Sequence, residues 1–477
     1  MPTEIQVAPP GITISQGRTF CVTDERGEIR PDTEEGIFAI DTRFISYYQL
    51  LINRHPWKLV TSGPLSFYAS RIHLTNPTIF TDEGEIPENS LSLTVDRQVE
   101  EGIHEDFYLA NYSMKPVRVL LGIELRSDFA DIFEVKSRRF VIRGSTHTTW
   151  SQSDCTLRTS YDYKDFHRTV SYSVSQGQAP VSFANGRVYF EINLQPSVEW
   201  HSCGEFILEH GPHTRKHSGH HTESFAPAFA SGAAPSPVED SSSDFDERQA
   251  RWLASCTTIE TPNEHVYRMH SKAVEDMGAL RIYDMDVSDE AWVPAAGVPW
   301  FVTLFGRDSL IVSLQNMSVA PGFARGALKR LAEYQATERD DWRDAQPGKI
   351  LHEIRFGELA HFNKIPFTPY YGTADATILY LTVLSETYRW TGDLQLLREF
   401  REVANGCLKW IDAYGDLDGD GFQEYKTYST LGYENLAWKD SYDAVVYADG
   451  TIVPQPKGLC ELQGYVYDAK VRMAEAF

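Results

Sequence analysis

The sequence predicts a chain of two parts, an antiparallel β-sandwich followed by a helical domain. Three observations lead to this fold class. Residues 1–225 contain short runs rich in Val, Ile, Tyr, Phe and Thr, with many apolar residues alternating along them. Residues 226–250 are rich in Ala, Pro, Ser and acidic residues, which is typical of a linker. From residue 251 to residue 477 the apolar residues recur at spacings of three and four, as on one face of a helix.

In residues 1–225 the expected strands follow one another at intervals of roughly ten residues, the spacing of an antiparallel sandwich. Turn-forming Gly, Asn, Pro and Ser residues separate them, and the alternation suits sheets with one buried face. The expected strands lie in FISYYQLLINRHPWKLV, SLSLTVDRQV, EDFYLANYS, VRVLLGIELR, RRFVIRGS and GRVYFEINLQP.

The helical part alternates between expected helices and long loops. Pro321 suits a helix start, and Gly392 and Gly415 suit helix ends. A toroid of six helical hairpins would need twelve helices, whereas about six are visible, so we expect only part of an (α/α)6-type toroid in this chain. The expected helices lie within 263–283, 307–317, 321–336, 373–392, 393–415 and 459–477, and the long loops are 286–303, 338–370 and 416–457.

The composition argues against several classes of partner. The chain has 44 basic and 67 acidic residues, a net charge of −23 that repels polyphosphate and anionic membranes. The start of the chain lacks a basic segment followed by an apolar run, and no apolar stretch approaches the roughly 20 residues that span a bilayer. The six cysteines are scattered, without CxxC spacing, as in proteins with reduced thiols. We therefore expect a cytoplasmic protein that binds neither nucleic acid nor membranes.

The first segment whose residues suit a binding or catalytic site is VPWFVTLFGRDSL. Trp300 offers a flat apolar face, and Arg307 and Asp308 offer paired charges, a combination found in sugar-binding sites. A capped helix start, with Asp308 or Ser309 as N-cap, explains this segment about equally well.

Two further loop segments are individually weak signals. His352, Glu353 and Arg355 crowd an irregular region, but HEIR lacks the second histidine of a zinc-protease HExxH motif. A surface salt-bridge cluster is slightly favoured there. Tyr371 and Asp375 stand at the start of an expected helix, where the helix dipole alone favours an acidic residue.

The segment DLDGDGFQEY resembles the opening of a calcium loop. Asp416, Asp418, Asp420 and Glu424 occupy positions 1, 3, 5 and 9, and Phe422 supplies a carbonyl at position 7. Position 12 is threonine instead of the bidentate glutamate of an EF-hand. A structural Ca²⁺ site and a metal-free Asp/Gly turn are about equally favoured, and no other cofactor is expected.

The segment NLAWKDSYDA holds Asp440 between Trp438 and Tyr442. Apolar rings beside a carboxyl group raise its pKa toward that of a general acid, whereas Lys439 would lower it. Taken alone, a solvated aspartate is favoured, and Asp443 competes for the role. All five segments, however, fall in loops or at helix starts, and one carbohydrate pocket explains them together.

The ordered set of these segments resembles the catalytic domain of bacterial amylo-α-1,6-glucosidase-type proteins, which are like glycogen debranching enzymes. These are six-hairpin glycosidases related to glycoside hydrolase families 63, 133 and 15. The first 225 residues resemble the β-rich domain that precedes this barrel. The segments that carry the resemblance are GIFAIDTRFISYYQLLI and SDFADIFEVK in the first part, then WFVTLFGRDSL, GKILHEIRFGE, YYGTADATIL, DLDGDGFQEY, WKDSYDA and LCELQGYVYDA.

The resemblance implies an inverting mechanism with Asp440 as general acid. It implies that Trp300, Arg307 and Asp308 hold the sugar at the cleavage site, and that some relatives bind calcium in a loop like 416–424. The general base of the family stands far beyond the acid, so we expect it beyond residue 477. Further residues expected at the pocket are Glu353, Arg355, Tyr371, Asp375, Trp438, Lys439, Glu461 and Gln463.

Three functions are therefore weighed, all with an oligosaccharide or polysaccharide partner. The leading one is an α-glucosidase acting on α-glucans or short α-glucosides. An inverting phosphorylase on the same scaffold would need several converging cations, and His352, Arg355 and Lys439 are few for that purpose. The third is a non-catalytic glycan-binding protein. The sequence indicates neither the linkage, the substrate length nor the oligomeric state.

Overall fold

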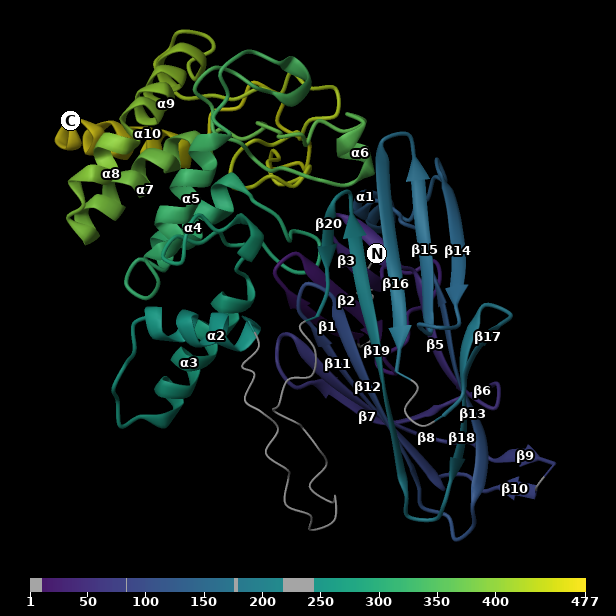
Figure 1. Cartoon of the computed structure of the whole chain (residues 1–477). Helices are drawn as coiled ribbons and strands as arrows, with labels where there is room; N and C mark the ends of the chain where they lie inside the picture. The colour runs from purple at the N-terminus through teal and green to yellow at the C-terminus, as the bar shows by residue number, and fades with distance from the viewer. Residues whose placement is uncertain (1–10, 83, 176–178, 218–243) are drawn as a thin grey trace. The chain divides into compact units, whose positions relative to one another are not determined.

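The computed structural model describes residues 11–82, 84–175, 179–217 and 244–477 (Figure 1). The chain divides into two compact units, Met1–Trp252 and Leu253–Phe477. The first unit is an antiparallel β-sandwich and the second is helical, which confirms the predicted fold class. Most of the expected linker lies outside the described residues. Its last part, residues 244–250, belongs to helix α2 (Asp244–Ser255).

The β-unit contains four antiparallel sheets within its described residues. The largest runs β14-β15-β16-β19-β12-β11-β8-β7, with β20 paired to β19, and a five-stranded sheet runs β17-β18-β13-β5-β6. A four-stranded sheet runs β1-β2-β3-β4, and β9 pairs with β10. The strands are β1 Gly11–Gln16, β2 Thr19–Asp24, β3 Gly36–Ala39, β4 Thr42–Ile45, β5 Tyr47–Ile52, β6 His55–Pro56, β7 Lys58–Pro64, β8 Ala69–Thr75, β9 Ile79–Thr81, β10 Gly84–Ile86, β11 Leu91–Val99, β12 Ile103–Asn111, β13 Val117–Arg126, β14 Ser145–Ser151, β15 Thr156–Tyr163, β16 Phe166–Val174, β17 Val181–Ala184, β18 Arg187–Leu194, β19 Glu199–His210 and β20 His213–Arg215.

Aromatic side chains form the core between the two large sheets. Phe190 of β18 meets Trp200 of β19 edge to face, with ring centroids 5.2 Å apart. The ring centroids of Tyr48 in β5 and Phe206 in β19 are 6.2 Å apart. Burial alternates along these strands, as the two-residue pattern predicted, because successive side chains point to opposite faces.

One expected strand, RRFVIRGS, is absent. The short helix α1 (Ile132–Ser137) ends at Arg138, whose backbone is left-handed, and residues 139–144 run on as an irregular loop. Val141 and Ile142 are 55% and 92% exposed. β-branched residues favour a strand chiefly by packing on neighbouring strands, and these two have no such packing.

The helical unit is organised around helix α7, which is buried along most of its length and packs against α4, α5, α9 and α10 (Figure 1). The segment 393–415, expected as one helix, is broken at the buried residue Phe400 into α8 and α9. The helices are α3 Glu264–Ala279, α4 Gly306–Gln315, α5 Gly322–Glu333, α6 Glu358–His361, α7 Asp375–Thr391, α8 Leu394–Glu399, α9 Arg401–Tyr414 and α10 Cys460–Ala476, with 3-10 turns η1 Tyr283–Met285 and η2 Asp341–Arg343.

Helices α7 and α10 run parallel to each other. Three side-chain pairs join them, and the partners are always 86 residues apart: Thr382–Asp468, Glu386–Arg472 and Arg389–Glu475. The starts of α4 and α7 also meet, through Arg307 and Asp375. The N-terminal ends of α4, α7 and α10 therefore lie on one side of the helices, where the long loops gather in Figure 1.

No helix in the described part of the chain is long and apolar enough to cross a membrane. All six cysteines are free thiols.

Candidate active site at the helix starts

Three loop segments pair through isolated β-bridges next to the start of α4. Glu353 forms antiparallel bridges with Phe305 on one side and Tyr370 on the other. Gly306 begins α4 against this ladder, and a Cβ atom there would lie 2.0 Å from the carbonyl oxygen of Leu351. A side chain at this position would push the helix away from the ladder, so the glycine brings the first turn of α4 to the site.

Arg307 is the central cation of the site. Its Nη2 donates to Asp440 Oδ2 at 2.7 Å, and its Nη1 lies 3.4 Å from Asp375 Oδ2. Nη1 also donates to the carbonyl oxygen of Ala437 at 2.9 Å. The guanidinium is buried and Asp375 is fully buried, whereas the Asp440 side chain is 42% exposed. Asp440 is thus the member of this group that a ligand can reach.

Burial perturbs the acids around Arg307. It raises the pKa of Asp375 above its ordinary value, although Arg307 and a hydrogen bond from Thr373 oppose the rise. It also raises the pKa of Asp308, against the attraction of Arg307. Clusters of perturbed acids with a specific charged partner occur preferentially at functional sites.

The setting of Asp440 differs from the one that its sequence neighbours suggest. Trp438 and Tyr442 are 62% and 69% exposed, and Lys439 and Asp443 are exposed as well. The two aromatic rings therefore do not enclose the Asp440 carboxyl group in an apolar pocket. The Asp440 carboxylate instead pairs with the Arg307 guanidinium.

A buried amide shapes the loop that carries Asp440. Asn435 Nδ2 donates to the carbonyl oxygens of Ser441 and Tyr442, at 2.5 and 3.3 Å. Lys457 Nζ donates to Asn435 Oδ1 at 2.7 Å and is itself buried. These contacts position the main chain directly after Asp440. The sequence did not indicate a role for either residue, because neither stands in a motif.

Glu353 is held by two neighbours. Arg355 Nε donates to Glu353 Oε2 at 2.6 Å, and the Tyr433 hydroxyl donates to Oε1 at 2.7 Å. Arg355 also donates to the carbonyl oxygen of Trp300 at 3.1 Å, so the main chain of Trp300 joins the same cluster. Glu353 and Arg355 form a buried ion pair, not a surface cluster.

His352 lies next to this cluster as a neutral side chain. Burial, and then the positive charge of Arg307, lower its pKa to about 3. Its ring meets Phe305 and Tyr433 edge to face. A neutral imidazole can donate or accept a hydrogen bond, but it adds no positive charge for an anionic substrate.

Several predicted pocket residues have main-chain partners. The Tyr371 hydroxyl donates to the carbonyl oxygen of Tyr334 at 2.7 Å. Gln463 Nε2 donates to the Gln423 carbonyl at 2.7 Å, and its Oε1 accepts from the Gln423 amide at 2.8 Å. Gln463 therefore ties loop 416–457 to α10. Glu461 is half-buried at the start of α10, where the Cys460 thiol lies 3.8 Å from its Oε2.

Asp344 is a structural anchor that the sequence did not reveal. Its carboxylate accepts hydrogen bonds from the Tyr370 hydroxyl at 2.8 Å and from the Thr427 hydroxyl at 2.7 Å. It also accepts from the amides of Tyr428 and Ser429, at 2.5 and 3.0 Å. This buried carboxylate joins the loop before α7 to the loop before α10.

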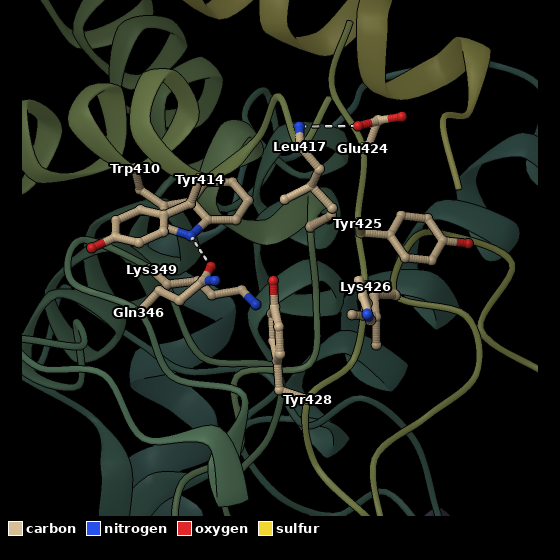
Figure 2. A pocket seen from close by; sticks show the side chains of 11 residues that line it. Gln346, Lys349, Trp410, Tyr414, Leu417, Glu424, Tyr425, Lys426 and Tyr428 are labelled. Carbon is tan, nitrogen blue, oxygen red and sulfur yellow. Dashed lines mark hydrogen bonds between the residues drawn. The ribbon is translucent and has the colours of Figure 1, made fainter. Parts of the chain in front are cut away.

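Trp410 and Tyr414, near the end of α9, line a small cavity of about 10 Å³. Figure 2 shows the side chains around it. Trp410 Nε1 donates to Gln346 Oε1 at 2.8 Å on its wall, and the buried Lys349 also lines it. A cavity of this size holds about one water molecule. It is too small for a sugar ring, and Asp440 is not among its lining residues.

The predicted calcium loop brings three of its acids together. One carboxylate oxygen each from Asp416, Asp418 and Asp420 lies within 4.8 Å of the others. Glu424 Oε2 instead accepts from the amide of Leu417 at 3.0 Å, and Phe422 exposes its ring. The oxygen donors at positions 1, 3 and 5 fit Ca²⁺. The acid at position 9 does not join them in this structure.

Comparisons with known proteins agree with this architecture. Residues 14–205 match the family model for the N-terminal domain of some glycogen debranching enzymes. A solved structure named "Putative kojibiose phosphorylase from human microbiome" aligns with 87% of the chain at 8% identity, with a TM-score of 0.53. At that identity the likeness shows the fold alone. The chain spans 58% of the length of that protein.

Other likenesses are weaker. An aldose 1-epimerase-like protein from Escherichia coli K12 covers 42% of the chain at 7% identity, with 99% of its own length aligned and a TM-score of 0.25. A heparinase III covers 43% at 7% identity, with 37% of its own length and a TM-score of 0.26. Scores this low carry no argument. No curated protein matches the chain significantly. The family match relates residues 14–205 to the N-terminal domain of some glycogen debranching enzymes, and the shared fold does not distinguish a hydrolase from a phosphorylase.

Proposed function

We propose that this chain belongs to an inverting glycoside hydrolase, an α-glucosidase of the amylo-α-1,6-glucosidase type, acting on α-glucans or short α-glucosides. The observation that supports it best is the group formed by Arg307, Asp375 and Asp440. It joins the starts of α4 and α7 to the loop before α10. Such a junction of loops, with perturbed acids around one cation, is a suitable place for a polar ligand.

Asp440 is the proposed general acid. In an inverting hydrolase one carboxyl group protonates the glycosidic oxygen while a second carboxylate, about 6.5–9.5 Å away, activates a water molecule. The partial exposure of Asp440 allows contact with a glycosidic oxygen. A proton donor must be neutral, so the proposal requires that bound substrate weakens the contact between Asp440 and Arg307.

Asp308 and Arg307 are proposed to hold the sugar in the cleavage site, with the Glu353–Arg355 pair and Trp300 beside them. Paired charges in a buried setting bind hydroxyl groups through charge-assisted hydrogen bonds. Burial raises the pKa of Asp308, while the charge of Arg307 opposes the rise.

An inverting phosphorylase is the second candidate, favoured by the name of the structurally similar protein. The cations near Asp440 do not support it well. Arg307 is bound to two carboxylates and Arg355 to Glu353. His352 is neutral. A phosphate ion would have to share both arginines with the carboxylates that they already contact.

The test compares products in the presence and absence of inorganic phosphate. The protein expressed from the complete gene is incubated with isomaltose, maltose, kojibiose and limit dextrin, and the first product is identified by NMR. A hydrolase of this kind releases β-glucose without phosphate. Formation of β-glucose 1-phosphate only when phosphate is present would replace the proposal with a phosphorylase. Absence of glycoside turnover by the wild type, with sugar binding that is equal in the wild type and in Asp440→Asn, would indicate a glycan-binding protein.

A further inference from the structure

Two neighbouring strands of the β-unit place metal-binding side chains on one face of the largest sheet. Asp106 of β12 is directly opposite Cys203 of β19, and Tyr108 is opposite His201. His104 precedes Asp106 by two residues on β12. Since side chains alternate between faces along a strand, these groups share one face. The other face carries core residues such as Phe107 and Phe206.

The donor atoms converge on the Asp106 carboxylate. His201 Nε2 lies 2.8 Å from Asp106 Oδ1, and Cys203 Sγ lies 3.4 Å from the same oxygen. Cys203 Sγ and His201 Nε2 are 3.8 Å apart. His104 Nε2 lies 3.4 Å from Asp106 Oδ2. His104 and Asp106 are buried, and Cys203 is half-buried.

These separations are close to those of a tetrahedral site. Zinc–nitrogen bonds of about 2.0–2.1 Å and zinc–sulfur bonds of about 2.3 Å place neighbouring ligand atoms roughly 3.3–3.7 Å apart. The triangle formed by His201 Nε2, Cys203 Sγ and Asp106 Oδ1 needs only small movements to reach them. Tyr108 stacks on the His201 ring, with centroids 4.7 Å apart, and so restrains its orientation.

The same geometry argues against a nucleophilic cysteine. In a Cys–His–Asp arrangement, one imidazole nitrogen faces the thiol and the other faces the carboxylate. Here a single nitrogen of His201 faces both groups.

We propose that Asp106, His201 and Cys203, with His104 as fourth ligand, bind a zinc-type divalent cation that links β12 to β19. Two imidazoles, a carboxylate and a thiolate form a donor set typical of Zn²⁺. On binding, Cys203 releases its thiol proton to solvent and forms the metal–sulfur bond. All four residues belong to the β-unit, whereas the residues of the proposed glycosidase chemistry belong to the helical unit.

The test uses the whole chain after removal of metals with EDTA and desalting. Titration with Co²⁺ should give one bound ion per chain and a thiolate-to-cobalt charge-transfer band, which Zn²⁺ then abolishes. Cys203→Ser should remove the band, and His201→Gln, a change at a partly exposed side chain, should weaken Co²⁺ binding at least tenfold. Cys460→Ser, at an exposed cysteine of the helical unit, should leave the band unchanged.

Thermal unfolding supplies a second readout. Zn²⁺ should raise the unfolding temperature of the wild-type chain and of Cys460→Ser, because an ion that binds only the folded state stabilises it. Zn²⁺ should raise the unfolding temperature of His201→Gln by a smaller amount. Absence of the charge-transfer band in the wild type, or a band of equal strength in Cys203→Ser, would overturn the proposal.

Discussion

Arg307 and Asp440 are 133 residues apart in the sequence, yet their side chains form an ion pair with an N–O distance of 2.7 Å. The contact joins the first turn of α4 to the loop before α10. It brings the proposed general acid to the same guanidinium that contacts the buried Asp375. Because Arg307 is buried, its replacement tests what the site contributes to stability. Because Asp440 is partly exposed, its replacement tests the part of the site that a substrate can reach.

Replacing Arg307 by methionine should destabilise the helical unit. Asp375 would remain fully buried without its cationic neighbour, and breaking a buried ion pair typically costs about 3 kcal/mol of unfolding free energy. Arg325→Met is the matched control, since its pair with Asp393 is partly exposed and is expected to contribute less than about 1 kcal/mol. Urea unfolding of the two variants measures the difference. Equal losses would contradict a structural role for Arg307.

Lys349 should make stability depend on pH above neutrality. Burial lowers its pKa from 10.5 to about 8, so between these values the unfolded chain binds more protons than the folded chain. Stability from this residue therefore rises as pH increases from about 8 to about 10.5, by at most about 3 kcal/mol.

The comparison that isolates this effect is between wild type, Lys349→Met and Lys409→Met, with urea unfolding at pH 8 and pH 10. Lys349→Met should lose the rise, because methionine does not titrate. Lys409 is exposed on α9, so its replacement should retain the rise. A rise of the same size in Lys349→Met would show that burial does not perturb this lysine.

The loop 416–424 remains a predicted calcium site. If it binds Ca²⁺, millimolar Ca²⁺ should raise the unfolding temperature of the wild type after EDTA treatment, and Asp418→Asn should reduce that rise. Asp449→Asn, in an exposed turn closed by Thr451, serves as control and should respond like the wild type. An unfolding temperature that does not respond to Ca²⁺ would leave the loop as a metal-free turn.

The sequence predicted the fold well where hydrophobic patterns are long and regular. Burial alternates along β18, as the sequence pattern predicted, whereas β11, β12 and β13 bury most of their residues on both faces. Helix α7 is buried along most of its length, and α10 buries Leu462, Ala469 and Met473 at helical spacing. The strand predicted for RRFVIRGS was wrong, because its β-branched residues lie in an exposed loop after α1. Composition alone was misleading there.

The site was predictable only in part, because its contacts join distant segments. The helix starts and loops indicated where Arg307, Asp375 and Asp440 would gather. They did not indicate that Gln463 binds the main chain of Gln423, or that Asp344 anchors the loop at 428–429. The cluster of His201 and Cys203 with Asp106 was also missed, since its residues come from two strands nearly a hundred residues apart and show no spacing motif.

The proposed function depends on Asp440 as the donor of the proton for glycosidic cleavage. The most direct measurement is the rate of sugar release by Asp440→Asn, with the exposed neighbour variant Asp443→Asn as control, in protein from the complete gene. We expect Asp440→Asn to lose about 100-fold or more of the activity with little change in unfolding temperature, and Asp443→Asn to keep it. Wild-type turnover by Asp440→Asn would show that another group donates the proton.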